Sequence, residues 1–90
     1  MSPFAKLIDK NSERELRAAA GAKRIGNGPG WSFPGINGLV LSPRLLVVGA
    51  LTRIATTPII GPIFAQGVAE RIKAGEDAQQ VARDLLAMLD

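Results

Sequence analysis

The chain has 90 residues, of which 47% are hydrophobic and 21% are charged, and it contains neither cysteine nor histidine. This length allows one small domain. The missing residue types exclude disulfides, thiolate metal sites and catalysis by a histidine base. The formal net charge is +3 at pH 7, so the chain is weakly basic.

The charge is unevenly distributed. Residues 1–24 hold six basic and three acidic side chains, residues 25–69 hold two arginines and no acid, and residues 70–90 hold three basic and five acidic side chains. The N-terminus lacks the order of a secretory signal, and its acids are atypical of a transit peptide. We therefore expect a location in the cytoplasm or within a macromolecular assembly.

The first 20 residues predict a short basic helical segment. Ser2-Pro3 is a helix-start signal, because Ser can cap a free N–H and Pro has no N–H to leave unpaired. It predicts a helical turn from Pro3 to about Lys10. Ser12 and Glu15 have the spacing of a capping box and predict a second start, with an end at Gly21.

Residues 21–38 contain six glycines and two prolines, so no regular element is expected there without tertiary contacts. This arm separates the N-terminal segment from a predicted helical core at residues 39–90. Two aromatic residues, Trp31 and Phe33, lie inside the arm. They either pin the arm onto the helices or form an exposed anchor that binds a partner.

A loose basic cluster spans the end of the N-terminal segment and the start of the arm. It consists of Arg14, Arg17, Lys23 and Arg24. Such charges usually form a solvated face, and Glu13 can pair with Arg17 one helical turn away. The alternative is a contact with nucleic-acid phosphates that does not depend on base sequence.

Ser42-Pro43 predicts the start of a helix that continues to about Ala55. This helix is apolar on nearly every side, so it is expected to be buried by its own domain, by other copies or by lipid. Gly49 inside it indicates the close approach of a neighbouring backbone. If Arg44 and Arg53 are near the core, each needs a carboxylate partner, such as Glu70 or Asp84.

Two further helices complete the predicted core. The first starts at Pro58 or after a bend at Gly61-Pro62, and ends at Ala74 with Gly75 as its C-cap. The last starts at Asp77, with Gln80 placed for a capping box. Its apolar stripe consists of Ala78, Val81, Leu85, Met88 and Leu89. The predicted class is all-α: a small helical bundle of about three C-terminal helices, a short N-terminal helix and a Gly/Pro-rich connecting arm.

Catalysis is not expected. No histidine can activate the serines, and the paired carboxylates, Glu13/Glu15 and Glu76/Asp77, look like helix-start charges rather than an acid/base pair. The glycines of residues 26–30 do not fit a phosphate-binding loop, because Asn27-Gly28 stands where Lys-Ser/Thr is required. We predict no enzyme activity, no cofactor and no bound metal.

The sequence favours an assembly or interaction subunit that docks on neighbouring protein chains or on its own copies, for example as a minor component of a virion or another large particle. Two alternatives remain. Residues 39–69 contain no acid and could insert into a membrane interface, although prolines and arginines interrupt any span. The basic N-terminal segment could instead make the chain a nucleic-acid accessory.

Overall fold

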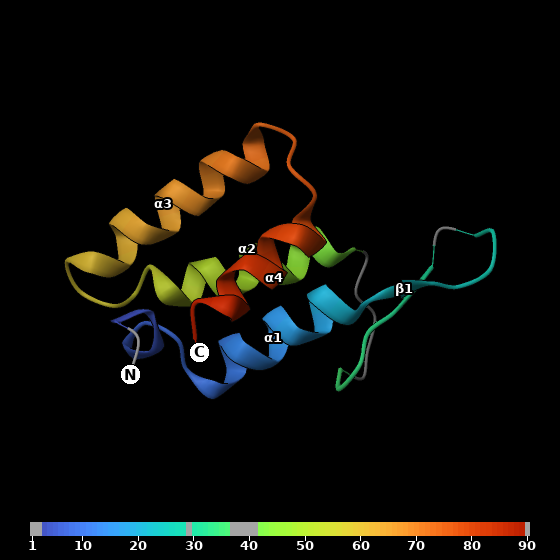
Figure 1. Ribbon diagram of the computed structural model, residues 1–90, viewed down its shortest axis with the longest axis horizontal. Helices are drawn as coiled ribbons and strands as arrows, with labels where there is room; N and C mark the ends of the chain where they lie inside the picture. Colours follow the sequence, from blue (N-terminus) through green and yellow to red (C-terminus); the bar gives the residue numbers. More distant parts are fainter. Residues whose placement is uncertain (1–2, 29, 37–41, 90) are drawn as a thin grey trace.

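The computed structural model describes residues 3–28, 30–36 and 42–89. The chain is a small all-α bundle, as predicted, with one two-stranded ladder (Figure 1). Its elements are η1 (Pro3–Lys6), α1 (Lys10–Gly21), β1 (Lys23–Arg24), β2 (Trp31–Ser32), α2 (Pro43–Ile54), α3 (Ile60–Lys73) and α4 (Ala78–Ala87). In Figure 1, α1, α2 and α4 pack together, α3 lies along one side, and the β1–β2 hairpin projects from the end opposite the α2–α3 turn.

The start of α1 differs from the predicted one. Asp9, not Ser12, is the N-cap, and its carboxylate accepts the backbone N–H of Ser12 at 2.7 Å. Helix α1 therefore begins one turn earlier, Ser12 is buried inside its first turn, and Glu15 has no part in a capping box. The preceding turn, η1, is a 3-10 helix that ends at Lys6 rather than near Lys10.

Helix α2 begins at Pro43 as predicted, although the Ser42 side chain makes no capping bond within the described residues. Helix α3 does not begin at Pro58; it begins at Ile60, in the turn that contains Gly61-Pro62. Its end lies one residue before the predicted one: the helix ends at Lys73, Ala74 and not Gly75 is the C-cap, and Gly75 follows with a φ of +92°.

Helix α4 starts where the sequence predicts. The Asp77 carboxylate accepts the backbone N–H of Gln79 at 3.0 Å. Gln80 does not complete a capping box, because its amide oxygen accepts from the Arg83 guanidinium at 3.2 Å, while its amide nitrogen donates to Asp84 at 2.9 Å. The predicted stripe is buried at Val81 and Leu85, whereas Met88 is exposed.

The core extends beyond the predicted 39–90 segment, because the N-terminal helix forms part of it. Leu16, Ala18 and Ala19 of α1 have no exposed surface, and α1 packs against both α2 and α4. Small side chains let helices approach closely, which suits the two alanines to this position. The basic N-terminal segment thus has one buried face and one solvent-facing side.

A side chain of α4 joins α1 to the arm. The Gln79 amide donates to the carbonyl of Ala19 at 3.1 Å and to that of Ala22 at 2.8 Å. These carbonyls lie at the C-terminal end of α1, where helical backbone groups lack partners within the helix. Gln79 therefore caps α1 and fixes the root of the β1–β2 hairpin to the bundle.

Candidate interaction surfaces

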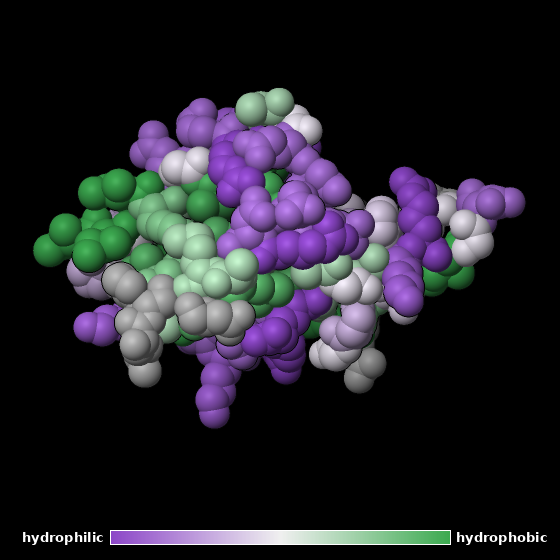
Figure 2. Space-filling model, viewed as in Figure 1, coloured by the Kyte–Doolittle hydropathy of each residue, from purple (hydrophilic) through white to green (hydrophobic). Residues whose placement is uncertain are grey.

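The most apolar exposed surface lies at the α2–α3 turn. Ile59, Ile60 and Ile63 are 82%, 61% and 72% exposed, and Met88, the C-cap of α4, is 44% exposed. We call these four residues the apolar end. Figure 2 shows a hydrophobic area at the end of the molecule that carries the α2–α3 turn. An isolated exposed isoleucine is ordinary, but three within five residues form a patch of the kind that marks interaction sites.

The backbone at Ile59 is strained. Its φ is +71° and its ψ is −66°, and the Ile60 N–H donates to the Pro58 carbonyl at 2.9 Å, which closes a tight γ-turn. Positive φ is unfavourable for a β-branched residue, and this type of γ-turn is rare. The turn thus holds an isoleucine in a costly conformation with its side chain in solvent.

A groove of about 510 Å³ opens beside the apolar end. Its lining combines η1 and the residue after it, the α2–α3 turn, the first half of α3 and the C-cap of α4: Phe4, Lys6, Leu7, Thr57, Pro58, Ile60, Phe64 and Met88. The rings of Phe4 and Phe64 lie 4.8 Å apart, so the N-terminal turn is attached to α3 by an aromatic contact. Lys6 is the one charged residue in this lining.

A second groove of about 430 Å³ runs between α2 and α3. Its lining is mostly apolar, and it includes the exposed Val48 together with Leu51 and Ala65. The charged residues of its lining are both basic, Arg44 and Lys73. Helix α3 packs less extensively on the bundle than α1 does.

The two central arginines are both exposed, so the condition under which each would need a carboxylate partner is not met. Arg53 nevertheless forms an ion pair, with Glu15 of α1 and not with Glu70 or Asp84. Gly49 makes room for this pair, because a Cβ at Gly49 would lie 3.0 Å from a Glu15 carboxylate oxygen. The close neighbour of Gly49 is thus a side chain and not a backbone.

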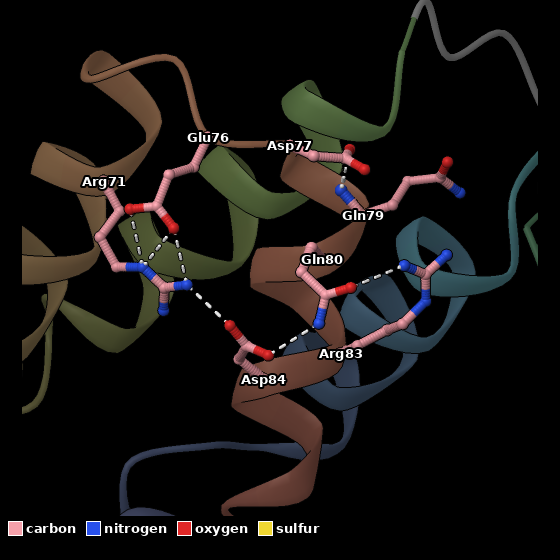
Figure 3. Close-up of polar contacts among 7 residues, drawn as sticks. All are labelled: Arg71, Glu76, Asp77, Gln79, Gln80, Arg83 and Asp84. Carbon is pink, nitrogen blue, oxygen red and sulfur yellow. Dashed lines mark hydrogen bonds and ion pairs between the residues drawn. The ribbon is translucent and has the colours of Figure 1, made fainter.

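Arg71 bridges α3, the following turn and α4 (Figure 3). Its guanidinium contacts the carboxylate of Glu76 at 2.9 Å and that of Asp84 at 2.7 Å. Hydrogen bonds to Glu76 and Asp84 raise the pKa of the Arg71 guanidinium above its ordinary value. Hydrogen bonds from Arg71 and Gln80 hold the pKa of Asp84 below its ordinary value. These residues link α4 to α3.

This bridge gives an acid-dependent contribution to stability. Because the folded pKa of Asp84 lies below its ordinary value, the contribution is present near neutral pH and is lost as pH falls through the folded pKa. We expect Asp84→Asn to melt at a lower temperature than the wild type at pH 7, and the two melting curves to converge near pH 2. Thermal melts followed by circular dichroism test this, and a constant difference down to pH 2 would contradict it.

The structure places the two predicted aromatic anchors differently. Phe33 is 9% exposed and belongs to the core, whereas Trp31 is half-buried at the edge of the bundle. Their ring centroids are 6.5 Å apart, and the Arg24 guanidinium lies 5.0 Å from the centroid of the Trp31 ring. Phe33 thus attaches the arm to the helices. Trp31, which lies in β2 of the hairpin, contacts Arg24 of β1.

All four residues of the predicted basic cluster are exposed. Arg17 pairs with Glu13 at 3.5 Å, as the spacing predicts, and Arg14 bonds the Asn11 side chain at 3.4 Å. Arg14 and Arg17 lie on α1, whereas Lys23 and Arg24 form β1 of the hairpin. The isoleucines of the apolar end were not predicted as a site; their only sequence signal is that they lie in residues 39–69, a stretch without acidic residues.

The chain matches no protein-family model, and neither a curated protein nor a solved structure matches it. Within residues 3–28, 30–36 and 42–89, no group of three or more acidic side chains is placed to hold a metal ion. In the same ranges, no helix combines the length and hydropathy needed to cross a bilayer.

Proposed function

We propose that this chain is a non-enzymatic interaction subunit that docks on a neighbouring protein chain through its apolar end, with self-association as the first form to test. The observation that carries the proposal is the exposure of Ile59, Ile60 and Ile63 beside an apolar groove. Burying such side chains against a partner would gain about 25 cal/mol for each Å² of apolar surface removed from water.

The strain at Ile59 supports the same proposal. A residue in a sparsely populated backbone region costs roughly 1–3 kcal/mol, and such residues cluster at functional positions. Here the strained residue is also the most exposed large hydrophobic side chain of the described residues. Neither feature stabilises the isolated chain, whereas a partner that covers Ile59 would offset the cost of both.

The test is light scattering behind a sizing column, without detergent and over a range of concentrations. We expect the wild type to form a defined oligomer and the double variant Ile59→Gly/Ile63→Gln to be monomeric. Glycine accepts a positive φ, so this variant should keep or raise its melting temperature while association falls. Loss of both association and fold would not support the proposal, because stability and docking are expected to separate.

The matched control is Leu45→Gln/Val48→Gln, which removes two exposed apolar side chains of α2 away from this turn. It should leave the oligomer intact. A wild-type chain that stays monomeric at 300 µM (roughly the range of weak complexes) would overturn self-association. If the monomeric wild type co-floats with anionic vesicles and the Ile59→Gly/Ile63→Gln variant does not, the apolar end binds a membrane and not a protein partner.

A further inference from the structure

A row of cations runs along the solvent-facing side of α1. Lys10, Arg14 and Arg17 are spaced by four and three residues, which places them on one face of a helix, and all three are exposed. With a rise of 1.5 Å per residue, the row spans about 10 Å. One strand of B-form DNA presents about three phosphates over the same axial distance.

The hairpin carries two further cations close to the end of this row. Helix α1 ends at Gly21, and only Ala22 separates it from Lys23 and Arg24 of β1. The Gln79 amide holds the Ala22 carbonyl at 2.8 Å, so the root of the hairpin is fixed to the bundle. We call Lys10, Arg14, Arg17, Lys23 and Arg24 the basic edge.

The acids of the N-terminal segment cancel part of this charge. Glu15 pairs with Arg53 of α2, so its charge is offset outside the row. Asp9 caps α1 through the backbone N–H of Ser12 and keeps its negative charge beside Lys10. Glu13 remains beside the row and contacts Arg17 at 3.5 Å. Exposed pairs of this kind are worth at most about 1 kcal/mol, so a phosphate can compete for Arg17.

An aromatic ring lies at the hairpin end of the basic edge. Trp31 is paired across the ladder with Arg24, whose guanidinium lies 5.0 Å from the ring centroid. Arg24 also bonds the Gly28 carbonyl at 3.5 Å. The arginine is thus held against an indole on a projecting hairpin, and both groups can stack on an unpaired base.

We propose that the basic edge binds single-stranded nucleic acid, with phosphates along α1 and a base stacked at the Arg24–Trp31 pair. A duplex offers phosphates but no unpaired base to stack, and an acidic protein surface would use the cations but not the ring. A lipid surface needs cations and apolar side chains on one face. On the hairpin, Ile25 is the one exposed large aliphatic side chain of the described residues, at 59%. The cluster of exposed isoleucines at the α2–α3 turn lies at the opposite end of the molecule from the hairpin (Figure 1).

The test uses a twelve-nucleotide oligothymidylate and the full chain. Trp31 is the only tryptophan, so its emission reports binding at the hairpin directly. We expect the oligonucleotide to quench Trp31. If the five cations of the basic edge each neutralise one phosphate, the salt slope is about −3.5, and affinity falls about 100-fold between 50 and 200 mM salt.

Two double variants that each remove two positive charges distinguish binding at the basic edge from binding that depends only on the net charge of the chain. Arg14→Gln/Arg17→Gln removes two cations of the row, and we expect its salt slope to fall to about −2. Arg44→Gln/Lys73→Gln removes two exposed cations beside the α2–α3 groove and should bind like the wild type. Arg24→Gln should reduce the quenching of Trp31 by a larger fraction than it reduces the salt slope.

Several results would overturn the proposal. One is an absence of binding by 100 µM chain at 50 mM salt; another is an equal loss of affinity in both double variants. Tighter binding of a duplex of the same length would exclude the stacking of an unpaired base. Equal binding of polyglutamate would show that the basic edge recognises acidic polymers in general and not nucleic acid.

Discussion

Replacement of Gly61 by alanine should destabilise the fold by about 3 kcal/mol or more, because the added methyl group has no space. An ideal Cβ at Gly61 would lie 2.1 Å from the Ile54 carbonyl oxygen and 3.0 Å from the Thr57 Cβ. The Ile54 oxygen is a backbone atom at the end of α2, so it cannot move away by a side-chain rotation. Relief requires the α2–α3 turn to open.

Gly67 provides the matched control for this substitution. It lies in the same helix, is exposed, and has no atom outside the local helix within 4 Å of an ideal Cβ. Gly67→Ala should therefore stabilise α3 by about 0.5–1 kcal/mol. In thermal melts, Gly61→Ala should melt at least about 12 °C lower than the wild type. Equal melting temperatures for the two variants would contradict the close contact at Gly61.

The Gly61 contact also explains why the start of α3 was predicted incorrectly. Thr57-Pro58 carries a local helix-start signal, and local signals decide the starts of α2 and α4 correctly. At α3 the determining contact is between Gly61 and Ile54, seven residues apart, at the crossing of two helices. The resulting sharp turn gives Ile59 its positive φ, which no propensity for isoleucine would predict.

The start of α1 was missed for a different reason. Asp9 and Ser12 are equally good N-cap residues, and local preference does not choose between them. The longer helix places Ser12 and Leu16 on the buried side, and that burial is a property of the whole bundle. Arg53 pairs with Glu15 at a separation of 38 residues, which a pattern based on neighbouring residues does not reveal.

The candidate surfaces were predictable in part. The basic cluster is visible as a run of charges, and its residues are exposed as the solvated-face interpretation predicts. The apolar end is different, because its isoleucines belong to a stretch in which most apolar residues are equally compatible with a core. Val68 is buried and Ile63 is exposed on the same helix. Helical spacing separates the two, because Ile63 lies about 140° around the helix from Val68. It does not reveal that no part of the fold covers Ile63.

Gln79→Glu should lower stability by about 3 kcal/mol, as the combined effect of two lost hydrogen bonds and a misplaced charge. A carboxylate cannot donate to the carbonyls of Ala19 and Ala22, which now accept at 3.1 and 2.8 Å. It also brings a negative charge to the C-terminal end of α1, where the helix dipole is negative.

One effect opposes this loss, and it is smaller. Residue 79 is the second residue of α4, where a negative charge favours the dipole of that helix by about 0.3–1 kcal/mol. Gln66→Glu, on an exposed position of α3, is the control and should change stability by less than about 0.5 kcal/mol.

Urea unfolding should be followed both by circular dichroism and by the emission of Trp31. Because Gln79 fixes the root of the hairpin, Gln79→Glu should expose Trp31 at urea concentrations below those that unfold the helices. Coincident transitions with wild-type stability would show that the hairpin is held to the bundle without this contact.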